Sequence, residues 1–336
     1  MLISILPRQF RHNLIRHNLK LLRLSLIPIL GFYISACSTL TSTSTIPATP
    51  APVIKAPTVA LVLGGGGAKG FAHVGVIKAL EENGIKPTLV VGTSVGSLIG
   101  SLYASGYTPA QLEQLSLTTT DSQLTDFTLS NQGFIEGIKL KNFINSKINA
   151  RAIEDFPIAF AAIAAEKHTL KKTVFTTGDA GLAVQASCSV PNIFIAPRIP
   201  EKVGKKYIDG GVVSLVPVDS AYDLGADIVI AVDVTGAQGS DSTNNQIPTM
   251  NSLSDFWGFL ETNIMATNLT TNRSASNQSE RDRADVVITP NVGRNSSIDT
   301  RQRRNLIQAG AQATTPQINA IKQLIQEKSS SKYATL

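Results

Sequence analysis

Residues 88–96, TLVVGTSVG, place a serine between two glycines directly after an apolar run. Gly92 and Gly96, two residues on either side of Ser94, allow the tight strand-to-helix turn that exposes a nucleophilic hydroxyl. Such a serine attacks an acyl carbonyl when a base takes its proton and donor groups stabilise the oxyanion. A plain glycine-rich loop gives the same pattern, so the catalytic interpretation depends on finding these partners.

Backbone amides for an oxyanion are available in the loop GGGGAKG at residues 64–70. The loop joins a predicted strand to a predicted helix, where free N–H groups and the helix dipole favour a negative charge. Its Gly-x-Gly-x-x-Gly spacing also matches a dinucleotide-binding loop. That class needs an acidic residue at the end of the second strand, where this chain reads VVG, and an ATPase-type loop needs Gly-Lys-Ser/Thr, where it reads KGF. Neither nucleotide class is favoured.

The four histidines offer no good general base. His12 and His17 lie in the N-terminal segment, and His73 precedes the serine. His168 lies among lysines in a predicted exposed turn. A triad in the usual order of serine, acid and histidine is therefore disfavoured.

Asp209, in the stretch YIDGG, is the better candidate base because it ends a predicted strand and two glycines follow it. A free aspartate has a pKa of about 3.9 and is a weak base at neutral pH, but partial burial raises that pKa. An ordinary Asp-Gly turn explains the same residues. Spacing alone leaves both interpretations open.

The elements around these motifs alternate between strand and helix, which predicts a mostly parallel sheet covered on both faces. The stretch 118–150 is polar and is hard to place beyond a helix near 137–147. The predicted strands are 58–63, 88–91, 158–165, 172–178, 205–211, 226–234 and 285–290. The other predicted helices are 71–84, 95–106, one that begins at Thr108-Pro109, 181–189, 217–225, about 253–280 and a region within 298–328.

Three motifs coincide in this chain, GGGAKG at 65–70, GTSVG at 92–96 and DGG at 209–211. The sequence between the motifs agrees with the same resemblance, notably AVQASCSVPNIFIAP before KYIDGG. Their order and spacing resemble the patatin-like phospholipase family over about residues 59–234. The resemblance implies a three-layer α/β/α sandwich with a mostly parallel central sheet. It also implies a lipid acyl hydrolase that uses a Ser–Asp dyad and needs no histidine, cofactor or metal.

The resemblance also assigns roles to residues of this chain. It makes Ser94 the nucleophile and Asp209 the proton acceptor, and the amides of Gly65, Gly66 and Gly67 form the oxyanion hole. The remaining motif glycines are Gly70, Gly92, Gly96, Gly210 and Gly211.

Two further positions of the loop are compared with the family. Gly70 is expected to permit close packing of the loop against a helix. Lys69 stands where members often carry arginine, and its role stays open.

The N-terminal segment is expected to direct export. Residues 1–36 contain five basic and no acidic residues, and their apolar run 24–36 is about half as long as a membrane-spanning helix. The run ends in Ile34-Ser35-Ala36-Cys37, which resembles the lipobox of bacterial lipoproteins, in which the cysteine is acylated. An ordinary secretory signal or a short membrane anchor is the alternative.

This interpretation predicts a lipoprotein signal peptide at 1–36 and a Ser/Thr/Pro-rich tether at 37–58. A catalytic core at 59–234 and a C-terminal helical extension at 235–330, packed on the core, follow them. The protein is then an exported bacterial lipoprotein held to a membrane through Cys37. Because serine follows that cysteine, the lipoprotein resemblance implies the outer membrane, facing the periplasm.

Composition limits the other classes of function. The chain has 336 residues and a net charge of +6, but without residues 1–36 it holds 25 basic and 24 acidic residues. A basic face for nucleic acid is therefore not expected. The hydrophobic share of 43% is typical of a globular protein. Cys188 is expected to be a small buried residue rather than a nucleophile.

The expected function is hydrolysis of fatty acyl esters of phospholipids or related lipids through an acyl-serine intermediate. A general carboxylesterase or thioesterase acting on small acyl esters is one alternative. A non-catalytic envelope lipoprotein is another, although it has no need of Ser94, Asp209 and the glycine loop together. The expected partners are an acyl-ester substrate such as a phospholipid and, through the N-terminal anchor, a membrane.

Overall fold

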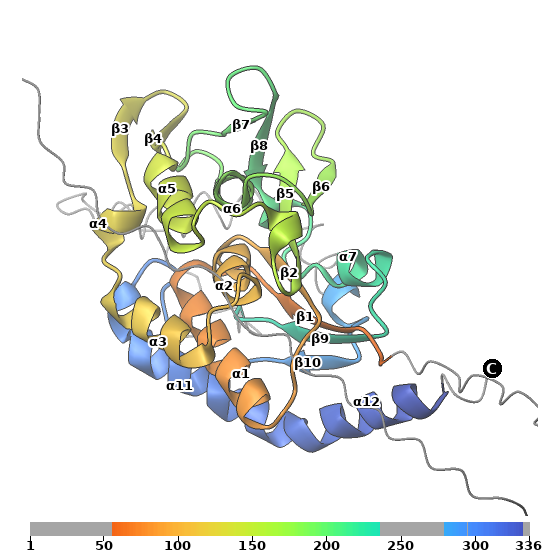
Figure 1. The fold of residues 1–336 in the computed structure, drawn as a ribbon. Coiled ribbons are helices and arrows are strands. Elements are labelled where there is room, and N and C mark those ends of the chain that lie inside the picture. Colours follow the sequence, from red (N-terminus) through yellow and green to blue (C-terminus); the bar gives the residue numbers. More distant parts are fainter. Residues whose placement is uncertain (1–55, 236–278, 294, 332–336) are drawn as a thin grey trace, which may run out of the picture. The chain divides into compact units, whose positions relative to one another are not determined.

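The computed structural model of the chain describes residues 56–235, 279–293 and 295–331. A central sheet of eight strands has the order β10-β9-β1-β2-β5-β8-β7, with β6 also paired to β5 (Figure 1). Five strands, from β10 to β5 in this order, are parallel, whereas β6 and β8 run antiparallel to β5, and β7 runs antiparallel to β8. The strands are β1 (Val59–Leu63), β2 (Leu89–Thr93), β5 (Ala159–Glu166), β6 (Lys172–Phe175), β7 (Arg198–Ile199), β8 (Lys205–Asp209), β9 (Ile228–Val232) and β10 (Val286–Ile288).

Side chains alternate along the central strands and form two buried apolar faces. In β1, Leu61 and Leu63 pack with helices α1, α2, α3, α5, α6, α11 and α12 on one face, while Ala60 and Val62 pack with α7 on the other. The predicted α/β/α layers and mostly parallel sheet are confirmed. These helices are α1 (Phe71–Glu82), α2 (Val95–Ala104), α3 (Pro109–Thr118), α5 (Ile138–Lys147), α6 (Ala180–Ser187), α7 (Val218–Asp223), α11 (Arg303–Thr314) and α12 (Ile318–Ser331).

Helix α11 packs against α1 at two glycines. A β-carbon on Gly75 would lie 1.8 Å from the carbonyl oxygen of Ile307, and one on Gly310 would lie 1.9 Å from that of Ala72. The C-terminal residues therefore contribute directly to the layer that carries the glycine loop.

The stretch that was hard to place contains a short helix, α4 (Asp121–Leu124), and an antiparallel hairpin of β3 (Phe127–Ser130) and β4 (Gly133–Ile135). The hairpin joins the rest of the domain through backbone bonds between residues 134–135 and residues 193–195. Strand β6 occurs where expected, but it forms a hairpin with β5 instead of extending the parallel order.

Several predictions lie outside the described residues. They concern the signal peptide, Cys37, most of the tether and the greater part of the helix expected at 253–280. Its last two residues, 279 and 280, are described and helical. Within the described ranges, no helix combines the length and apolar character that crossing a membrane requires.

Candidate active site

Ser94 lies alone between the end of β2 and the start of α2, so the predicted strand-to-helix turn is confirmed. Its backbone has φ 53° and ψ −126°, a sparsely populated conformation for a residue with a side chain. Ser94 is partly exposed, although both elements that flank it are largely buried. A strained, accessible serine at this position is the geometry of a nucleophile elbow.

Close backbone packing holds this turn in place. A β-carbon on Gly96 would lie 2.0 Å from the carbonyl oxygen of Leu63, so only glycine lets α2 approach the end of β1. A β-carbon on Gly70 would lie 2.4 Å from the Val95 side chain, which agrees with the expected close packing of the loop. Added β-carbons on Gly92 and Gly210 would also lie within 2.5 Å of backbone atoms.

A buried serine from a distant helix holds the backbone of Ser94. The Ser94 amide donates to Ser187 Oγ at 2.9 Å, and Ser187 Oγ donates to the Ile163 carbonyl at 2.6 Å. Ser97 Oγ donates to the Ser94 carbonyl at 2.7 Å. Sequence reasoning missed Ser187, because its separation of 93 residues from Ser94 leaves no local pattern.

Strand register brings Asp209 to the same end of the sheet as Ser94. Thr93 pairs with Ile163 on β5, and the next residue, Ala164, pairs with Asp209 on β8. Asp209 is only 6% exposed. Its Oδ1 accepts the amide of Gly211 at 2.7 Å, whereas Oδ2 has no hydrogen-bond partner among the described residues.

Burial raises the pKa of Asp209 to about 6, while the nearby Ser94 hydroxyl and the Gly211 amide act in the opposite direction. The Ser94 hydroxyl is thus close enough to affect the carboxylate, although Asp209 Oδ2 accepts no hydrogen bond from the described residues. A carboxylate with a pKa near 6 is a stronger base than an ordinary aspartate and is still largely ionised at neutral pH.

The glycine loop lies beside Ser94, since a β-carbon on Gly65 would lie 3.3 Å from Ser94 Cβ. The amide of Gly65 donates to the Leu215 carbonyl at 3.0 Å, so, contrary to the expectation, it is not available to an oxyanion. Among the hydrogen bonds of the described residues, none uses the amide of Gly66 or Gly67 as a donor. Gly67 has φ 57°, which glycine adopts without strain. The available donors are therefore Gly66 and Gly67.

His73, on α1, holds the glycine loop through a hydrogen bond. Its Nε2 lies 2.8 Å from the Gly64 carbonyl oxygen, which can only accept, so Nε2 carries the proton. Burial lowers the pKa of His73 to about 4, and the ring is neutral at physiological pH. His73 thus positions the loop, a role that its place before the serine did not suggest.

The C-terminal residues also contact the loop and the strand ends. The Ala68 amide donates to the Ser297 carbonyl at 2.6 Å. Ser214 Oγ donates to both carboxylate oxygens of Glu280, at 2.9 and 2.8 Å, and its carbonyl accepts from Thr93 Oγ1 at 2.9 Å. The chain beyond the predicted core therefore helps to fix the glycine loop and, through Ser214, the residue before Ser94.

Other predicted residues lie as follows. Cys188 is buried, and burial together with the charge of Asp209 raises the pKa of its thiol, so it is the expected inert residue. His168 is exposed in the β5–β6 turn, as expected. Lys69 is 4% exposed, and no ion pair of Lys69 occurs in the described part of the chain. In that same part, no group of three His, Cys, Asp or Glu side chains is placed to hold a metal ion.

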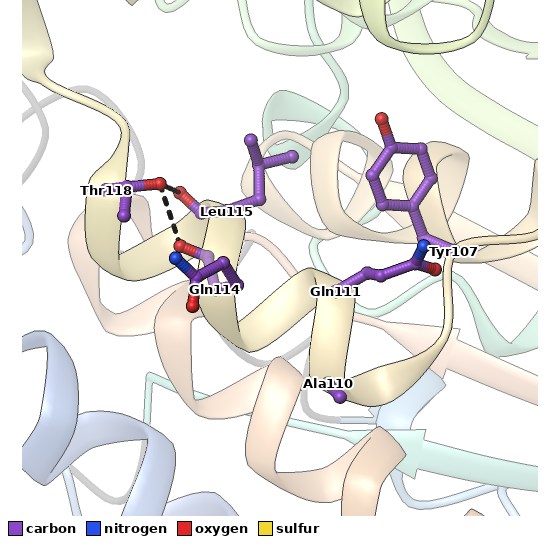
Figure 2. A pocket seen from close by; sticks show the side chains of 6 residues that line it. All are labelled: Tyr107, Ala110, Gln111, Gln114, Leu115 and Thr118. Atoms are coloured by element: carbon purple, nitrogen blue, oxygen red, sulfur yellow. Dashed lines mark hydrogen bonds between the residues drawn. The ribbon is translucent and has the colours of Figure 1, made fainter.

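A surface hollow of about 360 Å³ lies elsewhere, on α3 (Figure 2). Figure 2 shows the Tyr107 ring and Leu115 at its wall, with Thr118 Oγ1 directed back at backbone carbonyls of the same helix. Neither Ser94 nor Asp209 lines it, and its polar groups do not converge on one point. We assign it no function.

Replacing Ser187 with alanine is expected to lower kcat for a soluble acyl ester by roughly 10- to 100-fold with little change in KM. The variant leaves the Ser94 amide without its partner, and an unsatisfied buried group costs about 1–3 kcal/mol, which loosens the strained turn. Steady-state kinetics measures the effect. Ser105→Ala is the control, because the hydroxyl of this buried serine, which directly follows α2, bonds only to the carbonyl of Leu102 in that helix. Equal kinetics for both variants would show that Ser187 does not position the turn.

The fold and the site together define an α/β domain with a nucleophile elbow facing a buried carboxylate. Residues 61–222 match the family model described as patatin-like phospholipase. This part of the chain is a patatin-like phospholipase domain.

Two similar proteins and one structure illustrate the relationship. The chain is 35% identical over 217 residues to patatin-like phospholipase domain-containing protein ZK370.4 of Caenorhabditis elegans, covering 63% of this chain and 16% of that protein. It is 34% identical over 188 residues to uncharacterized NTE family protein Mb1092c of Mycobacterium bovis, covering 54% of this chain and 50% of that protein. The crystal structure of VipD from Legionella pneumophila has the same fold, with a TM-score of 0.52 and 15% identity over 79% of this chain and 67% of that one. The chain thus spans half or less of the length of these two sequence relatives.

Proposed function

We propose that this protein is a lipid acyl hydrolase that cleaves fatty acyl esters of phospholipids through Ser94 and Asp209. The family supports lipid hydrolysis in general. The observation that carries the specific proposal is the partly exposed, strained Ser94 beside a buried carboxylate with a raised pKa.

In the first half of the reaction, Asp209 accepts the proton of the Ser94 hydroxyl as its oxygen attacks the ester carbonyl. The amides of Gly66 and Gly67 stabilise the oxyanion, and one such donor contributes about 2.7–4 kcal/mol in related chemistry. The carbon–oxygen ester bond then breaks, and Asp209 returns the proton to the leaving alcohol. An acyl-serine remains.

In the second half, Asp209 accepts a proton from water as the water oxygen attacks the acyl-serine. The same amides stabilise the second oxyanion. The bond to Ser94 breaks, its oxygen regains the proton, and a free fatty acid leaves. Asp209 makes every proton transfer in this scheme, so no histidine is needed. His73 is neutral and buried, and its Nε2 is already hydrogen-bonded to the Gly64 carbonyl.

Defined phospholipid vesicles test the substrate class. The full chain is expected to release free fatty acid and lysophospholipid in equal amounts, as measured by mass spectrometry, and Ser94→Ala is expected to release neither. Hydrolysis of a soluble short ester without any release from vesicles would instead support the general esterase. No hydrolysis of either substrate would support the non-catalytic alternative.

We also propose that the chain is exported and anchored through Cys37. The support is the sequence of residues 24–37 alone, since Cys37 lies outside the described residues.

A further inference from the structure

Three turns extend beyond the end of the sheet that carries Ser94. Strand β5 is level with Thr93 at Ile163 and continues to Glu166, about 10 Å further at 3.3 Å per residue. The β5–β6 turn, the β7–β8 turn and the β3–β4 hairpin gather at this end of the domain (Figure 1).

Hydrogen bonds tie the three turns together. The amide of Lys167, in the β5–β6 turn, donates to the carbonyl of Lys206 on β8 at 2.8 Å. Lys206 Nζ donates in turn to Oε1 of Gln132, in the hairpin turn, at 2.8 Å. The turns therefore form one surface, which we define as residues 127–134, 167–171 and 200–206.

Large apolar side chains on this surface are exposed. Leu129 is 101% exposed, Val203 84%, Phe127 59% and Leu170 40%. Phe127 and Leu129 are the two exposed positions of β3, and each is followed by a partly buried residue. Apolar groups held in water on protruding turns are unfavourable unless another surface covers them.

The same surface is basic. Its residues include five lysines, Lys167, Lys171, Lys202, Lys205 and Lys206, and one acid, Glu201, in a chain that is nearly neutral past residue 36. Lys205 pairs with Glu166 at 2.9 Å, and Lys141 pairs with Glu201. Lys167, Lys171 and Lys202 are exposed and form no ion pair within the described residues.

We propose that this surface docks the protein on an anionic phospholipid bilayer, so that the end of the sheet with Ser94 faces its substrate. The apolar tips enter the interfacial region while the lysines contact lipid phosphates, a combination typical of interfacial binding. The tips come from separate turns with lysines between them, which suits a fluid lipid surface. The proposal rests on the proposed function and names the surface through which it operates.

Vesicle flotation of the full chain tests the proposal. Every form carries Cys37→Ser to prevent acylation and Ser94→Ala to keep the lipid intact. The vesicles are phosphatidylcholine alone or mixed with phosphatidylglycerol. Because each lysine contributes about fivefold to binding, Lys167→Glu/Lys171→Glu/Lys202→Glu should weaken binding to the anionic vesicles on the order of 100-fold and reduce its salt dependence. Leu129→Asp/Val203→Asp should weaken binding to both kinds of vesicle by about tenfold or more.

Control variants carry changes of the same kind at other exposed sites. Lys86→Glu/Arg304→Glu/Lys322→Glu alters the net charge equally, and Leu224→Asp replaces a residue that is 39% exposed directly after α7. Both should bind within about threefold of the parent. Equal losses in the controls, or none in the turn variants, would overturn the proposal.

The fatty acid assay separates this proposal from the proposed function. A form that retains Ser94 and binds through the turns, but releases no fatty acid, would refute the function and leave docking intact. Release of fatty acid that is unaffected by the turn substitutions would refute docking and leave the function intact.

Discussion

Replacing Ser94 with alanine is expected to lower kcat/KM for a short acyl ester by about 10⁴-fold or more. The substitution removes only the hydroxyl group, and without it no acyl-enzyme can form. Oxyanion donors and substrate binding then supply only the residual acceleration. Spectrophotometric assays of a soluble ester measure the loss of turnover, and a fluorophosphonate probe measures the loss of covalent labelling at Ser94.

Ser101→Ala is the matched control for this substitution. Ser101 lies on α2, which begins directly after Ser94; it is fully buried, and its hydroxyl donates only to the carbonyl of Leu98, at 2.9 Å. Its kinetics should stay within a few-fold of the unaltered chain. A Ser94→Ala form with the original turnover would remove the nucleophile from the proposed mechanism.

The strand-to-helix turn at Ser94 could be predicted because its determinants are local. Gly92 and Gly96 stand two residues on either side of the serine, and the apolar run before it is a typical buried strand. The parallel order of the main strands follows from the alternation of strands and helices, which also predicts that the strand ends share one edge.

The choice of oxyanion donors could not be predicted in this way. Gly65, Gly66 and Gly67 are identical in sequence, and their difference arises because the Leu215 carbonyl, from a loop 150 residues away, accepts the amide of Gly65. The same holds for Ser187, since a serine in a helix has many possible partners and only the folded packing places it under Ser94.

The direction of β6 in the sheet and the hairpin of β3 and β4 could not be predicted from the sequence either. The apolar stretch that became β6 fits either orientation, and the turn between Glu166 and Lys172 is short enough for a hairpin. Strand β3 of the hairpin exposes Phe127 and Leu129 and has no buried position, so it lacks the alternating buried pattern that identifies a strand against a core. Its apolar residues instead bear on binding to a lipid surface.

Replacing Asp209 with asparagine is expected to lower kcat/KM for the soluble ester on the order of 10³-fold, within the range that a general base contributes. In the unaltered chain, kcat/KM should rise with pH and level off above an apparent pKa of about 6, the pKa of Asp209. Asparagine keeps the acceptor for the Gly211 amide but cannot accept a proton, so this pH dependence should disappear. Asp223→Asn, an exposed change at the end of α7, should keep the original profile. A rise near pH 6 that persists in Asp209→Asn would assign the base to another group.

The same substitution should separate function from stability. Because burial raises the pKa of Asp209 from 3.8 to about 6 in the folded chain, the carboxyl binds its proton more tightly there than in the unfolded chain. Its contribution to the free energy of unfolding is therefore complete below pH 3.8 and is lost as pH rises through 6, by roughly 3 kcal/mol in all. Asparagine does not ionise, so Asp209→Asn should become progressively more stable than the unaltered chain between pH 4 and pH 7 in denaturant unfolding experiments. A pH-independent difference would show that folding leaves the pKa of Asp209 unshifted, whereas a difference that keeps growing up to pH 7 would show that the folded carboxyl stays protonated there and cannot accept the proton of Ser94.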